Sequence, residues 1–175
     1  MVVVPSTIET LTLYAQSVLT VAEEALALTD AGLPERSYNS PAAPTFDCCP
    51  ALMVHVAGLA EASTSPLSPS EVTARRGDFG NIILVSYVVT AIRCAPVPDS
   101  SGNPPSVAEI EAASVEVQQD GWALWNRLRH AVADGEIFDD CLGVHVDGGE
   151  PIREQGGCVG WIFTIRASIP GIPNP

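Results

Sequence analysis

Cysteine and histidine are the residue types in this chain that could support nucleophilic or metal chemistry, and the chain has five cysteines and three histidines. Cys48 and Cys49 are adjacent, whereas Cys141 and Cys158 come much later. A structural zinc site normally contains a closely spaced pair such as C-x-x-C, and adjacent side chains diverge too far to ligate one ion well. The spacing therefore favours buried thiols over a metal site, and we expect no cofactor.

A cysteine–histidine pair is the sharpest enzymatic alternative. Cys49 could act as a nucleophile with His55, His130 or His145 as its base. His55 and His145, however, lie among valines in segments with the pattern of strands, where a structural histidine is more common. The context of Cys49 also lacks a glycine-rich elbow or oxyanion motif. We therefore predict that the chain has no catalytic residues, with a small cysteine-dependent enzyme as the less favoured alternative.

Acidic side chains gather in the run DGEIFDD, which contains Asp134, Glu136, Asp139 and Asp140. Carboxylates at this density suggest a calcium site, but the run lacks the ligand spacing of an EF-hand loop. A solvated acidic turn explains the run better.

Composition excludes several function classes. The 175 residues carry a formal net charge of −13 and 46% are hydrophobic, which suits one folded domain but not a general binder of nucleic acid or anionic membranes. All eight basic residues are arginine, a usage typical of a GC-rich genome. The N-terminus lacks the features of a signal peptide, and no apolar run is long enough to span a membrane. We expect a cytosolic protein, at least where it is made.

The segment from Phe79 to Cys94 is the longest β-type run, and it organises the predicted fold. Read with a period of two, both of its faces are largely apolar, which predicts a central strand covered on both sides. One face presents Ile82, Leu84, Ser86, Val88, Thr90 and Ile92, and the other presents Ile83, Val85, Tyr87, Val89 and Ala91.

Two amphipathic helices are predicted. The first begins at a capping box formed by Ser6 and Glu9 and stops before Gly32 and Pro34. Its apolar face contains Leu11, Tyr14, Val18, Val21, Ala25 and Leu28. The second begins at a capping box formed by Ser106 and Glu109 and ends near 134–135. Its apolar face contains Ile110, Ala113, Val117, Gly121, Leu124, Leu128 and Ala131.

The remaining segments complete a two-layer α+β sandwich. Strands are predicted over 50–62, 140–148 and 156–169, with a turn around Gly148, Gly149 and Pro151 between the last two; the connector 33–47 could add a short edge strand. The predicted order is α-β-β-α-β-β, with two long helices on one face of a four-stranded, mainly antiparallel sheet. Residues 1–175 form one domain, with a long loop or arm at 63–78 and an extended tail at 170–175.

This order of elements, over Ser6 to Ile169, together with the size, the acidic charge and the long loop, resembles the tail terminator proteins of long-tailed bacteriophages. The absence of lysine is consistent with a phage of a GC-rich actinobacterial host. Other head–tail connector or completion ring proteins are similar in size and remain an alternative.

The resemblance implies a structural virion protein of the head–tail junction, assembled in the host cytoplasm. It would form a hexameric ring on the major tail tube protein, stop tube growth and contact the head–tail connector protein. DNA would pass through the ring without specific binding, and an acidic lumen would keep phosphates from adhering.

Partner contacts are predicted in two places. Arg75 and Arg76 are the only adjacent basic pair and provide a quarter of the positive charge, on an acidic chain with many carboxylates. We expect the loop that contains them to be mobile in the monomer and to become ordered against a neighbouring subunit or the tail tube. The full set of predicted contact residues is Arg75, Arg76, Asp78, Phe79, Glu35 and Arg36.

Overall fold

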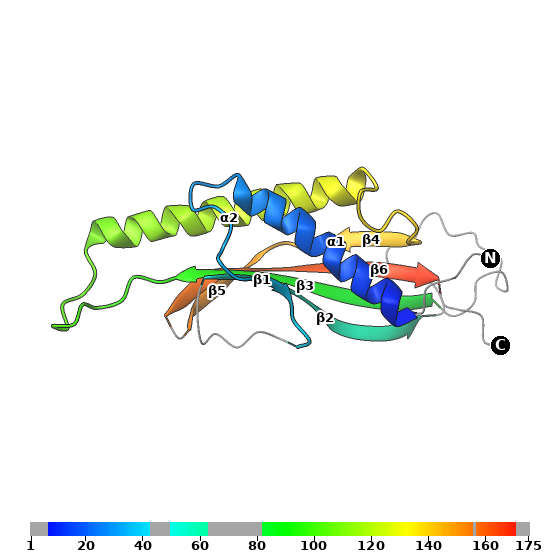
Figure 1. The fold of residues 1–175 in the computed structure, drawn as a ribbon, viewed down its shortest axis with the longest axis horizontal. Coiled ribbons are helices and arrows are strands. Elements are labelled where there is room, and N and C mark those ends of the chain that lie inside the picture. Colours follow the sequence, from blue (N-terminus) through cyan, green and yellow to red (C-terminus); the bar gives the residue numbers. More distant parts are fainter. Residues whose placement is uncertain (1–6, 43–49, 63–81, 156, 171–175) are drawn as a thin grey trace.

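A computed structural model describes residues 7–42, 50–62, 82–155 and 157–170. The described elements are α1 (Thr7–Ala27), β1 (Ser37–Asn39), β2 (Ala51–Ala62), β3 (Ile82–Cys94), α2 (Val107–Ala133), β4 (Gly143–Val146), β5 (Glu150–Gln155) and β6 (Cys158–Pro170). Both helices lie on the same face of one sheet (Figure 1). Within the described residues, no helix is both long enough and apolar enough to cross a membrane.

The sheet has six strands and mixed direction. Its order is β1-β2-β3-β6-β4, and β5 also pairs with β6. β1 runs parallel to β2, whereas all the other pairs are antiparallel. β4 and β5 follow each other along the same edge of β6, because β4 pairs with its second half and β5 with its first half.

The prediction of a four-stranded, mainly antiparallel sheet in the order α-β-β-α-β-β was wrong. The order in the structure is α-β-β-β-α-β-β-β. β1 lies in the connector that was expected to hold at most a short edge strand. β5 includes Pro151, which the sequence assigned to a turn. A proline is tolerated on an edge strand because its missing N–H need not pair with a neighbour.

β3 is central, as predicted. It pairs along its length with β2 on one side and β6 on the other. The face towards the helices contributes Val85, Tyr87 and Val89 to the main core. On the opposite face, Ile92 packs with a smaller cluster of buried residues that includes Met53.

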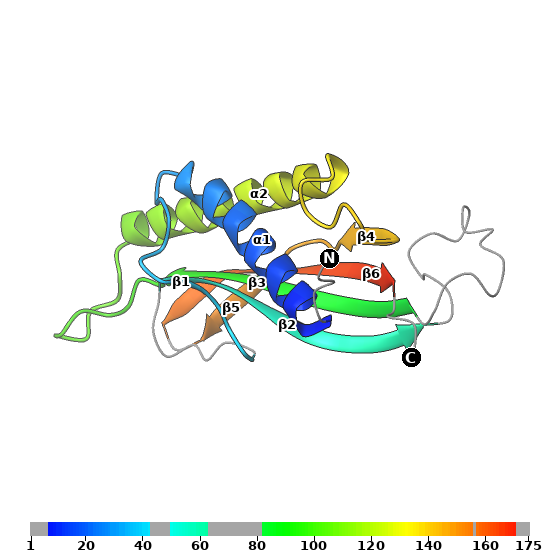
Figure 2. The same cartoon turned by 45° about the vertical axis from the view of Figure 1, so that its right-hand side comes forward.

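The two helices divide the sheet between them. α1 packs on β1, β2 and β3, while α2 packs on β3, β4 and β6, and Figure 2 shows α1 crossing the sheet diagonally beside α2. The predicted buried face of α1 is confirmed at Val18 and Ala25, for example. Leu28 was expected on that face but is 88% exposed, because the helix ends one residue earlier, at Ala27.

The predicted start of α2 is confirmed. The Ser106 hydroxyl accepts a hydrogen bond from the Glu109 backbone N–H at 3.3 Å, and the Glu109 carboxylate accepts from the Ser106 N–H at 2.8 Å. The helix ends at Ala133 with Asp134 as its C-cap residue, followed by Gly135 at a positive φ of 68°. The first capping residue expected for α1, Ser6, lies outside the described residues.

A buried ion pair joins α2 to the sheet and to the end of α1. Arg93 of β3 donates to Asp120 from Nε at 2.7 Å and from Nη2 at 3.1 Å, and the two side chains are only 10% and 4% exposed. Arg93 also donates to the Gly32 carbonyl at 2.5 Å, and Thr29 donates to Asp120 at 3.1 Å. Removing either charge would leave its partner buried and uncompensated.

Candidate partner-binding groove

The N-terminal end of α2 projects beyond the ends of the strands (Figure 1). In residues 107–118, every side chain is exposed apart from the half-buried Ala113 and Val117. Ile110 is 50% exposed, although it continues the stripe that is fully buried at Leu124. An apolar helical stripe in water gains none of the tertiary packing that normally stabilises a helix. This half of the stripe is therefore available for contact with another molecule.

An open apolar groove of about 680 Å³ lies beneath the N-terminal half of α2. Its walls come from α2, from the segment that follows β3, and from β5 and β6. The residues that form them include Ile110, Ala113, Val117, Ala95, Pro96, Pro98, Pro151, Ile152 and Trp161. Side chains of this kind, apolar and partly rigid, are typical of surfaces that bind peptides or protein segments.

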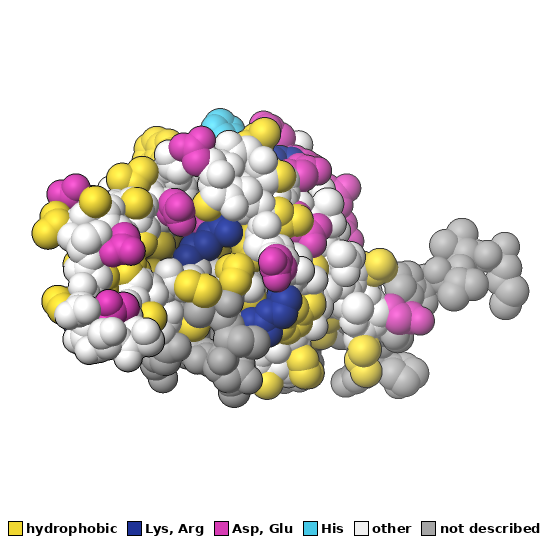
Figure 3. Space-filling model, turned by 60° about the vertical axis from the view of Figure 1, so that its left-hand side comes forward, with side chains coloured by type: hydrophobic (Ala, Val, Ile, Leu, Met, Phe, Trp, Pro, Cys, Tyr) yellow, Lys and Arg dark blue, Asp and Glu magenta, His cyan; other side chains and the backbone are white. Residues whose placement is uncertain are grey.

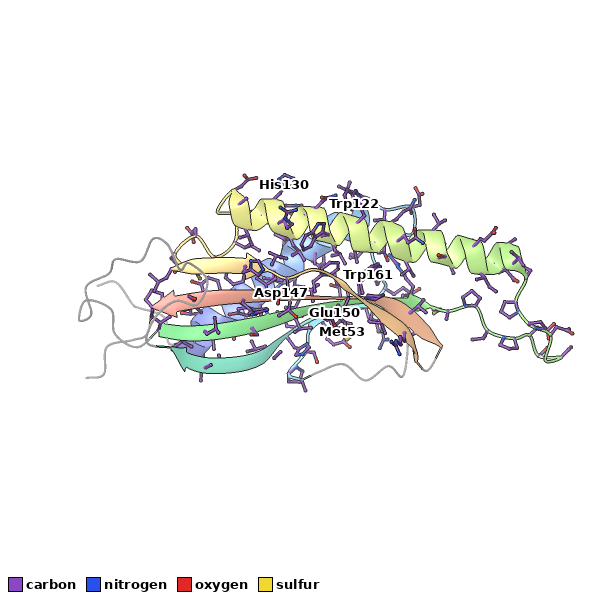
Figure 4. The ribbon with its side chains drawn as sticks, turned by 180° about the vertical axis from the view of Figure 1, so that it is seen from behind. Met53, Trp122, His130, Asp147, Glu150 and Trp161 are labelled. Atoms are coloured by element: carbon purple, nitrogen blue, oxygen red, sulfur yellow. The ribbon has the colours of Figure 1, made fainter. Side chains whose placement is uncertain are left out.

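The groove continues along α2 into a smaller aromatic hollow of about 290 Å³, lined by Trp122, Trp125, Trp161 and Phe163 among others. Trp125 and Trp161 both stack on Phe163, at centroid distances of 6.5 and 6.2 Å. Figure 4 shows Trp122 on α2 and Trp161 beneath it. We call the two hollows together the α2 groove. All three tryptophans of the chain line it.

Trp161 forms a fixed floor where the two hollows meet. Its indole N–H donates to the Val117 carbonyl at 2.8 Å, one of the last carbonyls before the helix reaches the core. A Cβ atom on Gly121 would lie 2.5 Å from the same indole nitrogen. Glycine at 121 therefore permits the close approach of ring and helix, and a larger residue would displace the ring.

Charge surrounds the α2 groove but does not enter it. Among the described residues that line the larger hollow, none is charged. The helix above carries Glu109, Glu111 and Glu116, all exposed, and has no basic residue from 107 to 126. Hydrogen bonds from Ser106 hold the pKa of Glu109 below its usual range. Figure 3 views the molecule towards this end and shows hydrophobic and acidic side chains interspersed, with two patches of basic side chains between them.

The chain matches no protein-family model and no curated protein sequence. The α2 groove must therefore be interpreted from its own residues.

The described cysteines lie in three different environments. Cys158 is buried and Cys94 exposed, and Cys141 is half-buried. Burial raises the pKa of the Cys141 thiol to about 11, despite a side-chain hydrogen bond with Tyr14 that lowers it. This thiol is protonated at neutral pH and is therefore a weak nucleophile. Cys49, the nucleophile considered from the sequence, lies outside the described residues together with Cys48.

The histidines considered as bases lie on three different elements. His55 is on β2, His130 in the last turn of α2, and His145 on β4. His55 is buried, and burial lowers its pKa. A buried, neutral histidine in mid-strand agrees with the structural role that its sequence context predicted.

The acidic run after α2 forms a turn whose carboxylates have protein partners. Glu136 binds Arg127, which also binds Glu24 of α1 at 2.7 Å. Asp140 accepts a hydrogen bond from the Tyr14 hydroxyl. In the described part of the chain, no cluster of three or more acidic, histidine or cysteine side chains has the arrangement of a metal site. The acidic side chains of this turn instead tie it to both helices.

The predicted contact residues fall into two groups. Arg75, Arg76, Asp78 and Phe79 lie outside the described residues. Glu35 and Arg36 directly precede β1, at the edge of the sheet opposite to β4 and β5. Glu35 is exposed, and the Arg36 carbonyl accepts from the Leu52 N–H at 2.8 Å. The structure does not bring 35–36 to the α2 groove.

Sequence reasoning missed the α2 groove. The stripe from Ile110 to Ala131 reads as one continuous core face, and nothing in its period indicates that the sheet beneath it ends early. Two signals do point that way. The loop that enters the helix is rich in proline, with Pro96, Pro98 and Pro105, and the charges in the first half of the helix are all acidic.

Proposed function

We propose that this chain is a structural virion protein that forms a ring on the tail tube of a long-tailed phage, ends tube polymerisation and joins the tail to the head connector. The observation that carries the proposal is the α2 groove beneath an unsupported half-helix. An exposed apolar surface of this kind marks a contact with another protein, and a ring requires each subunit to present such a surface to the next.

Charge supports the same function. The net charge of −13 disfavours adhesion of DNA to the protein, as a channel for DNA requires. The buried Arg93–Asp120 pair holds α2 on the sheet, and the Arg127 network joins α2 to α1, which suits a rigid subunit. A head–tail connector or completion ring would need the same features, so it is the alternative within this class.

The enzyme alternative is less well supported by the described residues. A cysteine nucleophile needs a lowered pKa and a base within hydrogen-bond reach. Cys141 has a raised pKa instead, and its ionisable neighbours are Tyr14 and two aspartates. The two aspartate charges raise the pKa of the Cys141 thiol further, which disfavours the thiolate that a nucleophile needs.

The test is the mass and shape of the native protein, followed by its effect on tube growth. We expect native mass spectrometry and electron microscopy of the purified chain to show a closed ring with a central opening, hexameric if the resemblance extends to ring size. Added to polymerising tail-tube subunits of a long-tailed phage from the same source, the protein should limit tube length and lie at one tube end.

Other results would contradict the proposal. Rings that bind no tube end but bind a portal or connector protein would favour the alternative ring protein. A monomer that neither assembles nor binds tubes would remove the whole class.

A further inference from the structure

We propose that the α2 groove of one subunit binds residues 63–81 of a second copy of this chain, with Arg75 and Arg76 of that segment against the acidic rim. It rests on the proposed function, because it identifies the contact that joins neighbouring subunits. Residues 63–81 lie outside the described ranges, but their sequence is known, and so are the positions of the two strands that they connect.

The segment and the groove belong to opposite ends of the molecule. Ala62, the last residue of β2, pairs with Ile82, the first residue of β3. The α2 groove begins just beyond the other end of β3, at Ala95. Figure 1 shows these ends on opposite sides of the molecule. The 13 residues of β3 separate them by about 40 Å at about 3.3 Å per residue.

This separation excludes, within one chain, a contact that includes the larger hollow and its acidic rim. The 19 residues between Ala62 and Ile82 must return to the strand beside the one they leave. They can therefore extend outward by about nine residues, or about 30 Å when fully stretched. That distance is shorter than the length of β3, so the segment does not reach the far end of the larger hollow, at Ala95 and Ile110, or the glutamates above it in its own subunit. Only the smaller hollow, at Phe163, lies closer to the segment. The groove of a neighbour placed head to tail is within reach.

The chemistry of the segment matches the groove. Pro66 and Pro69 are spaced as P-x-x-P, with Leu67 between them. Proline-rich segments of this spacing adopt an extended helix of three residues per turn and bind grooves lined by aromatic rings. The α2 groove offers such a surface in Trp122 and Trp161.

The charges match as well. The segment has Arg75 and Arg76 balanced by Glu71 and Asp78, so it is neutral on a chain of net charge −13. It can approach the acidic half-helix without the repulsion that an average surface of this protein would meet. The two arginines can pair with rim carboxylates such as Glu111 and Glu116, for which the guanidinium group suits bidentate pairing.

Two variants separate the two sides of the contact. Ile110→Asp places a charge in the groove, and Arg75→Glu with Arg76→Glu reverses the charge of the segment. Val115→Asp is the matched control for the first, because Val115 is 53% exposed on the same stretch of helix but does not line the groove. Far-ultraviolet circular dichroism checks that each variant folds.

The mixing experiment uses these variants in native mass spectrometry. Each of the two variants alone should stay monomeric, whereas Val115→Asp should assemble like the unmodified chain. An equimolar mixture should form heterodimers and nothing larger, because only one intact segment and one intact groove remain. Adding Glu111→Arg and Glu116→Arg to the Arg75→Glu, Arg76→Glu chain should restore assembly.

Binding of a synthetic peptide of residues 63–81 provides a second test. The peptide is added to the Arg75→Glu, Arg76→Glu chain, which should be monomeric and keeps its groove intact. Since all three tryptophans line the groove, binding should change the tryptophan emission and saturate. The peptide with both arginines changed to glutamate should bind about tenfold more weakly, because two exposed ion pairs are lost and two repulsive pairs replace them.

The results distinguish this contact from the proposed function. If both variants form rings normally and the peptide leaves the fluorescence unchanged, the proposed contact is wrong but the ring is not. If Ile110→Asp alone then loses tube binding, the groove binds the tail tube instead. An unmodified chain that forms no ring but binds the peptide would retain the contact and overturn the proposed function.

Discussion

The two halves of α2 share one apolar stripe, but the second half packs on the sheet and α1 while the first half borders an open groove. In the second half, Gly121, Leu124 and Leu128 are buried against the sheet and α1. In the first half, Ile110 of the same stripe lines the open groove and is 50% exposed. The sequence pattern is the same in both halves, so the difference comes from the strands beneath, which end before the helix does.

A stable subunit can therefore carry an apolar helical surface that its own strands do not cover. A helix of about three turns is marginal in water by itself. The first half is held by continuity with the anchored second half, by its capping box and by the Trp161–Val117 hydrogen bond. Its apolar stripe contributes little to the monomer and is available to a neighbour. The two halves should therefore respond very differently to substitution.

The largest effect is expected at the anchor, with Asp120→Ala. The substitution leaves the Arg93 guanidinium buried and without its carboxylate, which should lower the free energy of unfolding by about 3–5 kcal/mol. Urea unfolding followed by circular dichroism measures the change. Arg127→Ala is the control, because its ion pairs are partly exposed and their loss should cost about 1 kcal/mol or less. Similar losses for the two variants would contradict the role of Asp120 as the anchor.

The direct comparison of the halves uses Leu128→Ala and Ile110→Ala. Leu128 is 0% exposed, so truncation should create a cavity and destabilise the monomer by about 2–5 kcal/mol. Ile110 loses contacts only with the groove wall, and we expect a loss of under about 1 kcal/mol. Equal losses in the monomer would show that the first half of α2 is as well packed as the second, which would contradict the proposed difference between them.

Much of the fold follows from local patterns in the sequence. The period of two in β3 and the capping box at Ser106 each involve neighbouring residues, and both predictions are confirmed. The two strands beyond the predicted four, of which β1 was considered only as an option, depend on pairing instead. β1 has only three residues and exists because it lies beside β2, and β5 contains a proline that an edge position tolerates. Pairing of this kind has no local signature.

The groove escaped prediction for a related reason. Whether Ile110 is buried depends on how far β5 and β6 extend beneath α2, which no residue of α2 specifies. The sequence did indicate that Arg75 and Arg76 are unusual on this acidic chain. It could not indicate their binding surface, since the groove walls come from four separate segments.

A smaller effect is expected from Ser106→Ala at the start of α2. The variant loses the hydrogen bond to the Glu109 N–H and should reduce helix stability by about 1 kcal/mol. Because the first half is weakly packed, the loss should appear as local opening and not as global unfolding. Hydrogen exchange should therefore become faster in residues 107–113 while protection around Leu128 stays unchanged. Uniformly faster exchange along α2 would contradict independent opening of the two halves.

The smallest effect is the response of the same cap to acid. Hydrogen bonds from Ser106 lower the pKa of Glu109 in the folded protein below its ordinary value of 4.5. A carboxylate with a depressed pKa stabilises the fold above its unfolded pKa, and that contribution disappears as the pH falls through the folded pKa. Hydrogen exchange in the first turn of α2 should therefore accelerate, relative to the core half of the helix, once the pH falls below about 4.5.

Glu109→Gln isolates this titration. Glutamine can accept the same backbone hydrogen bond but does not ionise, so the capping box persists at all pH values. The variant should show a constant ratio of exchange rates between the two halves of α2 from pH 6 to about pH 3, where the unmodified chain shows a rising one. If the ratio rises equally in both proteins, another carboxylate controls the projecting half, and the cap at Ser106 is not what holds it in helical form.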